Sequence, residues 1–300
     1  MLKSFNKQSN FLINNIQKRN FGANEKALKA RIKSVSSIAK ITKAMKMVSS
    51  SKMRYDLIRL EGGKNFGHHS IDKILKSDQY VQRKVNSISG NRTLYVPFTS
   101  DKGLCGGINS VIIRELKLIF KQGNNDNSGL YIIGDKGITG LSRHFGSIIK
   151  KGIHDIQVPM NYATAAAISH DIIKESEDFD KIVLVYNVYK SAISNILTKT
   201  ELYTRKRFLD LMDFSKAYFL DNPDKRTVNP ALYDLYLSSN FYYAILNNLA
   251  SEQSARMGAM ENASKNAKEI VEKLLLQYNK ARQARITMEL VEIISGASAV

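Results

Sequence analysis

The sequence lacks the residues and segments that would place it in several common classes of protein. Its single cysteine, Cys105, excludes a disulfide framework and a four-cysteine zinc site. Its longest apolar runs, such as IVLVY, are far shorter than the ~18 residues that a membrane-spanning helix needs. The sequence alone therefore predicts a soluble protein of a reducing compartment, with no direct membrane span.

Proline and glycine are almost missing from both ends of the chain. The four prolines all fall between positions 97 and 230. Residues 23–61 contain neither proline nor glycine, and residues 231–295 contain only Gly258. Both segments can therefore be continuous helices, longer than a compact domain holds and typical of a coiled coil.

Apolar residues recur along both segments at the alternating three-and-four spacing of a coiled coil. In the C-terminal segment the predicted stripe comprises Leu246, Leu249, Gln253, Arg256, Met260, Ala263, Ala267, Ile270, Leu274, Gln277, Ala281, Ala284, Met288 and Val291. In the N-terminal segment it comprises Leu28, Ile32, Val35, Ile38, Ile41, Met45 and Val48. Two such helices from opposite ends of one chain most simply wind together antiparallel.

The middle of the chain alternates between β-rich and helical segments. TLYVPFT, LYIIGD and KIVLVYNVY are β-rich, whereas NSVIIRELKLIF and ATAAAISHDIIKES have helical character. This alternation predicts an α/β domain with a largely parallel sheet. Residues 62–92 and 202–230 are polar and show no pattern that assigns them.

Acidic residues are scarce, and the formal net charge is +18, which favours an anionic partner. Residues 1–24 contain no acid, and their apolar side chains can share one helical face, which is typical of an organelle transit peptide. A disordered basic terminus is the alternative. Residues 26–54 also lack any acid, although a solvated coiled coil normally mixes Glu with Lys. This favours an acidic partner that runs alongside the coil.

The run TSDKGLCGGINS, at residues 99–110, has the layout of a phosphate-binding loop but not its spacing. A Walker loop ends in Gly-Lys-Ser/Thr, whereas Lys102 precedes the glycines here. The glycines also lack the dinucleotide-binding spacing, so a tight structural turn is the favoured interpretation. The histidines show no ligand spacing and Cys105 has no evident base. The sequence therefore predicts no catalytic residue, no metal site and no cofactor.

Three of these segments resemble one family, the gamma subunit of F-type ATP synthase in its mitochondrial form. LKARIKSVSSIAKITKAMKMVSSSKMR is similar to the opening helix of that family, and TSDKGLCGG is similar to its most distinctive internal loop. The segment from YYAILNNLASEQSARMGAMENASKNAKEIVEKLLLQYNKARQARI to the C-terminus resembles the C-terminal helix of the family. The resemblance weakens over residues 62–92 and 202–230.

The resemblance implies a fold and a function. The expected fold class is α/β, with a long antiparallel coiled coil of the terminal helices and a central Rossmann-like domain. The expected domains are a mitochondrial transit peptide (1–24), an N-terminal coiled-coil helix (25–61), a linker and central α/β foot domain (62–230), and a C-terminal coiled-coil helix (231–300). Such a chain is a rotor shaft that turns inside a ring of alpha and beta subunits. Proton flow turns the shaft, and the active sites belong to the partners.

The resemblance also implies partners and site residues. The partners are the alpha and beta subunits, the delta and epsilon foot subunits and the membrane c-ring, on the matrix side of the mitochondrial inner membrane, without nucleic acid. The expected contacts with beta subunits are Met45, Lys46, Lys52, Lys102, Cys105, Arg282 and Gln283. An apolar tip that turns in a sleeve of the ring is expected at Val291, Ile293, Ile294 and Val300.

Two other functions remain open at this point. A basic coiled-coil protein could bind nucleic acid, although its aromatic residues are not interleaved with the basic ones as stacking platforms would be. A small α/β enzyme with helical arms would need a catalytic constellation, which the sequence does not show. Co-purification with an alpha–beta assembly distinguishes the gamma subunit from both.

Overall fold

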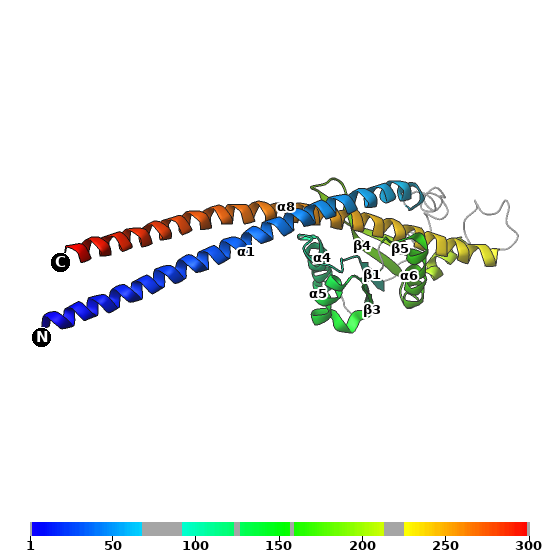
Figure 1. Cartoon of the computed structure of the whole chain (residues 1–300). Helices are drawn as coiled ribbons and strands as arrows, with labels where there is room; N and C mark the ends of the chain where they lie inside the picture. Colours follow the sequence, from blue (N-terminus) through cyan, green and yellow to red (C-terminus); the bar gives the residue numbers. More distant parts are fainter. Residues whose placement is uncertain (1, 68–91, 123–126, 157–158, 213–224, 299–300) are drawn as a thin grey trace. The chain divides into compact units, whose positions relative to one another are not determined.

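The computed structural model describes residues 2–67, 92–122, 127–156, 159–212 and 225–298 (Figure 1). The chain divides into two compact units, which are described separately below. The coil unit comprises residues 1–46 and 260–300, and the α/β unit comprises residues 47–259. Two long helices, α1 (Leu2–Gly67) and α8 (Lys225–Ala297), contribute residues to both units.

The α/β unit is built on one five-stranded sheet with the strand order β3-β2-β1-β4-β5. Its strands are β1 (Thr93–Pro97), β2 (Ser128–Ile133), β3 (Ile149–Ile153), β4 (Lys181–Tyr189) and β5 (Asn195–Tyr203). The first four strands pair in parallel, and β5 pairs antiparallel with β4. The predicted α/β class with a largely parallel sheet is therefore confirmed.

Helices connect these strands. They are α4 (Ile108–Gln122), α5 (Asp135–Phe145), the short 3-10 helix η2 (Gly146–Ile148), α6 (Tyr162–Glu175) and α7 (Arg205–Met212). The Asn161 side chain caps α6, because its Oδ1 accepts a hydrogen bond from the Thr164 amide at 2.8 Å. Crossover helices of this kind are what parallel strands require.

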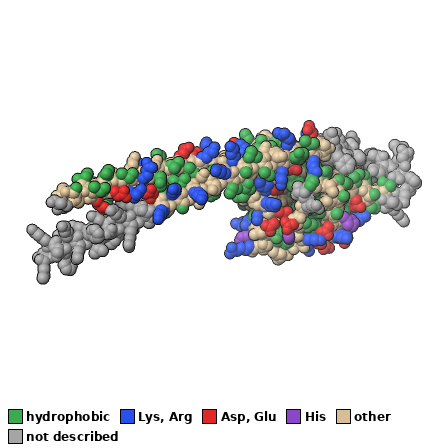
Figure 2. All heavy atoms as spheres, in the orientation of Figure 1, with side chains coloured by type: hydrophobic (Ala, Val, Ile, Leu, Met, Phe, Trp, Pro, Cys, Tyr) green, Lys and Arg blue, Asp and Glu red, His purple; other side chains and the backbone are tan. Residues whose placement is uncertain are grey.

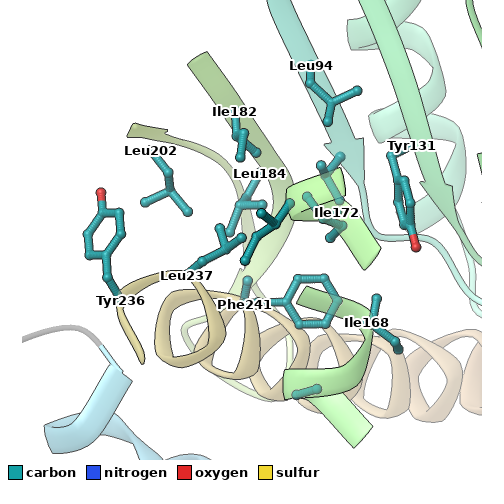
Figure 3. Packing of buried hydrophobic residues seen from close by; sticks show 14 of the residues in the cluster. Leu94, Tyr131, Ile168, Ile172, Ile182, Leu184, Leu202, Tyr236, Leu237 and Phe241 are labelled. Carbon is teal, nitrogen blue, oxygen red and sulfur yellow. The ribbon is translucent and has the colours of Figure 1, made fainter. Parts of the chain in front are cut away.

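The sheet is buried on both faces because neighbouring strand residues point to opposite sides. In β4, Ile182 and Leu184 join one apolar cluster, and Val183 joins the other. The first cluster packs against α6 and the first half of α8, where Figure 3 shows Ile172 and Phe241. The second cluster packs against α4 and α5. The β-rich runs of the sequence are thus core strands, hydrophobic at nearly every position.

The coil unit pairs the first part of α1 with the last part of α8, antiparallel as predicted (Figure 1). Lys46 Nζ lies 2.6 Å from Glu261 Oε1, and Arg285 Nε lies 2.9 Å from Glu25 Oε2. Partner numbers rise in one helix as they fall in the other, which only an antiparallel pair produces.

The predicted stripe of the C-terminal helix is half right. In the coil unit the positions that recur every seven residues from Met260 are the less exposed ones, as predicted. The intervening positions lie one residue later than predicted. Ala263 and Ser264 are both half-buried, and beyond them the contact stripe contains Val271, Tyr278, Arg285 and Glu292 in place of Ile270, Gln277, Ala284 and Val291.

The predicted stripe of the N-terminal helix holds at Met45 but is wrong at Ile38, Ile41 and Val48. Ile38 and Ile41 are 51% and 58% exposed, whereas Ala39 and Thr42 take the less exposed positions. Ser264 Oγ lies 3.4 Å from the Ala39 carbonyl oxygen, because small side chains at this seam let the helices approach closely. The larger apolar side chains are therefore free to face outward.

Both long helices extend past their predicted ends. We expected glycine to end the first helix at residue 61, but α1 continues through Gly62 and Gly63 to Gly67. A Cβ at Gly63 would lie 2.8 Å from Leu246 Cδ1, so the missing side chain makes room for α8. Pro230 was expected to precede the last helix, yet α8 already begins at Lys225. Proline removes only one helix hydrogen bond and costs least near a helix start.

Candidate partner interface

The glycine-rich loop after β1 is held by its own hydrogen bonds. Ser100 Oγ donates to the Lys102 carbonyl at 2.7 Å and accepts from Asn109 Nδ2 at 2.7 Å. Asn109 Oδ1 also accepts from the Ser100 amide at 3.0 Å, which ties the loop to the first turn of α4. These bonds tie the start of the loop to α4 through side chains of its own segment. The structure therefore supports the interpretation of a tight turn.

The turn needs unusual backbone angles next to α8. Leu104 and Gly106 have φ angles of 61° and 64°, in the left-handed region that glycine adopts without strain. A Cβ at Gly106 would lie 3.7 Å from the Ala255 carbonyl oxygen and 3.8 Å from Ala259 Cβ. The glycine thus serves the backbone turn, which is what its sequence context predicted.

The neighbouring end of β2 depends on the same loop. Thr99 Oγ1 donates to the Ile133 carbonyl at 2.7 Å and accepts from the Gly137 amide at 2.8 Å. Asp101 Oδ1 accepts from the Asp135 amide at 3.0 Å, at the start of α5. At Gly134, whose φ is 95°, a Cβ would lie 2.1 Å from the Thr99 carbonyl oxygen. Two loops at the carboxyl edge of the sheet are therefore locked together.

Lys102 lies on the surface of the loop, whereas the Cys105 side chain lies inside it. Lys102 is exposed, and its carbonyl oxygen lies 3.5 Å from Arg256 Nη2. Cys105 is 2% exposed, and its Sγ accepts from Asn109 Nδ2 at 3.2 Å. Cys105 is predicted to lie at an interface with a beta subunit, and the structure adds that the loop folds around its side chain. The sequence does not reveal this, since a cysteine between glycines fits either position.

The predicted contact residues on α1 differ in their exposure to solvent. Lys52 is exposed, as are most of the basic side chains between residues 26 and 54. Lys46 instead pairs with Glu261 across the coil, and Met45 is half-buried. The exposed lysines present positive charge with no acidic residue of their own segment beside them, as the sequence predicted.

The end of α8 exposes the predicted polar pair and the predicted tip. Arg282 and Gln283 both face solvent. Val291, Ile293 and Ile294 are 54%, 68% and 66% exposed, and Val300 lies outside the described residues. Figure 2 shows hydrophobic side chains gathered toward this end of the helix. Apolar side chains in such a group are typical of a surface that another protein covers.

Sequence reasoning missed two buried acids, Asp56 on α1 and Glu252 on α8, which line a cavity within the α/β unit. A signal was present, because Asp56 is the first acid after a long acid-free run. Within the described residues, no group of three His, Cys, Asp or Glu could hold a metal ion. No helix in that part of the chain is long and apolar enough to cross a membrane.

Comparison with known proteins gives one consistent family. The family model for ATP synthase matches residues 24–300. The ATP synthase gamma chain of Pelagibacter ubique is 36% identical over 285 residues, covering 91% of this chain and 98% of that protein. The mitochondrial ATP synthase gamma subunit of Ipomoea batatas is 37% identical over 280 residues, covering 90% and 83%.

A solved structure agrees with these relatives. A chain in the central stalk and c-ring of the Tetrahymena thermophila mitochondrial ATP synthase is 43% identical, with a TM-score of 0.70. The match covers 75% of this chain and 99% of that chain. These similarities support the prediction of a central-stalk subunit over that of a nucleic-acid-binding protein. Since gamma chains match it along nearly their whole length, the chain belongs to the ATP synthase gamma subunit family.

Proposed function

We propose that the chain is the central rotor stalk of a proton-translocating ATP synthase and couples proton-driven rotation to ATP synthesis in the alpha–beta ring. The observation that carries the proposal is the outward surface of the two long helices. It is basic and acid-free over residues 26–54 of α1, and it is apolar at the end of α8. A coiled coil that faces water mixes both signs of charge instead. This surface suits partners that surround it.

The exposed basic residues supply the electrostatic part of the contact. Lys52 and Lys102 face outward, and we assign them to an acidic surface of the beta subunits. Arg282 and Gln283 can reach polar groups of a partner from adjacent positions on α8. Cys105 contributes indirectly, because its buried side chain helps to hold the loop that carries Lys102. Exposed ion pairs contribute only about 0–1 kcal/mol each, so many weak contacts share the work.

The apolar end of α8 supplies a different kind of contact. After Glu292 the sequence contains no charged side chain. Ile293 and Ile294 would sit in an apolar sleeve of the ring, where dispersion and burial act without directional bonds. A rotating part benefits from this, because few hydrogen bonds have to break during a turn.

In this proposal the chain is not itself catalytic. The active sites belong to the alpha and beta subunits, and the α/β unit meets the delta and epsilon foot subunits and the membrane c-ring. The Tetrahymena relative is described as part of a central stalk and c-ring, which supports this assembly. The chain would then lie on the matrix side of the mitochondrial inner membrane as a peripheral subunit.

A mitochondrial location further requires an import signal, which we assign to residues 1–24. The family match begins at residue 24, and the preceding residues are basic and acid-free. Sequencing the N-terminus of the chain recovered from mitochondria tests this assignment. We expect a start near Phe21, and recovery of a chain that begins at Met1 or Leu2 would rule it out.

Affinity purification of the tagged full chain, followed by mass spectrometry, tests the central function. We expect alpha and beta subunits in near-fixed proportion to the chain, resistant to nuclease treatment. Recovery of nucleic acid without an alpha–beta assembly would reject the proposal.

The contact of the polar pair is tested in the purified alpha–beta–gamma assembly. Replacing Arg282 and Gln283 with alanine keeps helix propensity and should lower ATP hydrolysis. The matched control replaces Arg205 and Lys206, an exposed adjacent pair on α7, and should leave hydrolysis unchanged. Equal rates in both double variants would remove this contact from the proposal.

A further inference from the structure

A cavity of about 740 Å³ lies within the α/β unit, next to the glycine-rich loop. Its floor is the carboxyl edge of the sheet, where Thr99 follows β1 and Ile133 ends β2. Its other walls come from α1 and α8. Ligands of open α/β sheets bind at this edge. The volume is in the range of small-molecule sites.

One side of the cavity is acidic and buried. Asp56, on α1, is only 9% exposed. No hydrogen bond or ion pair reaches its carboxylate from the residues that the structure describes. The side chain of Glu252, on α8, is 12% exposed and is paired, since Arg256 Nη2 lies 2.5 Å from its Oε1. Within the described part of the chain, the Asp56 carboxylate therefore has no direct partner.

The charged groups around Asp56 do not offset the unfavourable effect of burial on its carboxylate. Burial is the main cause that raises the pKa of the Asp56 carboxyl to about 6. The positive charge of Arg59 opposes this rise, the negative charge of Glu252 adds to it, and the positive charge of Lys52 opposes it. Burial also raises the pKa of Glu252, against the effect of Arg256 and with a further contribution from Asp101. The lining also contains basic side chains: Lys52 and Lys102 are exposed, so water screens their charge, Arg256 pairs with Glu252, and Arg59 is half-buried. A positive group beside Asp56 would be favourable.

Another part of the lining is apolar. Phe98 and Ile133 come from the sheet, Met160 from the segment before α6, and Ile245 and Leu249 from α8. A ligand that fits both parts combines a positive group with an apolar body. A bare metal ion fits neither, because the described residues offer no group of three ligands.

We propose that this cavity binds a small organic cation, with a primary ammonium group on the Asp56 carboxylate and an apolar body against Phe98, Ile133 and Leu249. A hydrogen bond between an ammonium group and a carboxylate is charge-assisted, and the buried carboxylate would gain its missing partner. The bound molecule would contact α1, α8 and the sheet together, and would hold them in place.

Isothermal titration calorimetry on the full chain tests the proposal without any partner subunit, so its outcome is independent of the central-stalk function. The probe is n-hexylammonium chloride, compared with 1-hexanol and sodium hexanoate of the same chain length. We expect saturable binding of one ammonium per chain, with the other two probes weaker by at least about tenfold, equivalent to 1.4 kcal/mol. Equal or tighter binding of hexanoate would overturn the proposal, as would no saturation at about 10 mM ammonium.

Two variants locate the binding site. Asp56→Asn keeps the shape of the side chain and should weaken ammonium binding by about tenfold or more, as expected for the loss of a bond to a charged group. Asp155→Asn is the matched control, because Asp155 lines the same cavity with an exposed side chain. Its affinity should stay within about twofold of the unsubstituted chain. Unchanged affinity in the Asp56 variant, with an intact melting transition, would overturn the proposal.

The pH dependence gives a third readout. Binding should weaken as the pH falls from 7 toward 5, because protonation removes the negative charge of Asp56. The dependence should be absent in Asp56→Asn. Affinity that does not change with pH in the unsubstituted chain would contradict the assignment to this carboxylate.

Discussion

The two units of the chain differ in where they place their large apolar side chains. In the α/β unit, Tyr131, Phe208 and Phe241 are almost fully buried between the sheet and its helices. In the coil unit, Met260 and Leu274 share the seam with small residues such as Thr42, and isoleucines such as Ile41 and Ile293 face outward. The α/β unit completes its own core. The coil unit leaves much of its apolar surface exposed, which is the surface that the proposed function assigns to partner subunits.

The largest effect on this contrast should come from the core of the α/β unit. Phe241→Ala removes a fully buried ring that contacts Phe98, with ring centroids 5.1 Å apart. We expect a loss of about 3–5 kcal/mol in the free energy of unfolding. Urea titration followed by tyrosine fluorescence measures it, because 13 of the 14 tyrosines lie in residues 47–259. Ile193→Ala, at a position 97% exposed, is the control and should change stability by less than about 0.5 kcal/mol.

The second prediction concerns the opposite case, an apolar side chain that faces outward. Ile294→Asp should leave the stability of the isolated chain unchanged, since Ile294 is 66% exposed. In the alpha–beta–gamma assembly it puts an unpaired charge into an apolar sleeve, at a cost of several kcal/mol. ATP hydrolysis should therefore fall by at least about tenfold. Ile294→Ala is the matched control, and an aspartate variant as active as this alanine variant would show that the tip lies in water.

A third prediction uses the buried acid of the α/β unit. The pKa of Asp56 rises from 3.8 to about 6, with burial as the main cause. Between these values the folded chain binds more protons than the unfolded chain, so this carboxyl lowers stability as the pH rises through that window. Asp56→Asn should therefore gain stability relative to the unsubstituted chain between pH 4 and pH 6, and keep the gain at pH 7. Urea titrations at both ends of the window measure this, with Asp155→Asn, at an exposed carboxyl that lines the same cavity, as the control.

The smallest effect should come from the ion pair of the coil unit. Lys46→Glu places a second carboxylate opposite Glu261, but side-chain exposures of 36% and 59% limit the loss to about 1 kcal/mol or less. The exchange Lys46→Glu with Glu261→Lys should restore stability. Activity in the assembled enzyme separates the two roles of Lys46. If the exchange restores activity as well, Lys46 serves the coil; if activity stays low, it also serves a partner.

The sequence predicts the α/β unit well where its strands are buried on both faces. The runs around Leu94, Tyr131 and Leu184 are apolar at nearly every position, and they became β1, β2 and β4. The edge strands were missed. The sequence IKKGI, which forms β3, is too polar to be recognised as a strand. The sequence NILTKTELY, which forms β5, has a mixed burial pattern and was not recognised either. A strand with one open side has no need of a continuous apolar pattern.

The seam of the coil could not be predicted from hydrophobicity alone. The pattern selected Ile38 and Ile41, because a seam usually takes the most apolar residues of a helix. The structure instead places Ala39 and Thr42 at the seam. The most apolar face of this helix stays exposed in the isolated chain, and the proposed function assigns it to a partner. Sequence periodicity finds such a face but does not say which protein covers it.

The candidate contact residues also differ in how well the sequence predicts their exposure. Exposure of Lys52, Lys102, Arg282 and Gln283 follows from their charge and polarity. Burial of Cys105 depends on the path of its own loop, in which Asn109 lies four positions away. The pairing of Lys46 depends on Glu261, which lies 215 positions away in the sequence. Local patterns do not encode pairings at such separations.

The two edge strands have a consequence for the chain before it is assembled. An open strand edge offers unpaired amide and carbonyl groups to any other strand, and charged side chains, lysine above all, discourage this. β3 exposes Lys150 and Lys151, with Lys151 Nζ 2.7 Å from Asp171 Oδ2. β5 exposes Lys199, whose Nζ lies 2.5 Å from Glu115 Oε1. These charged side chains thus protect a newly synthesised chain against edge-to-edge strand pairing with identical copies before it is assembled into the ATP synthase.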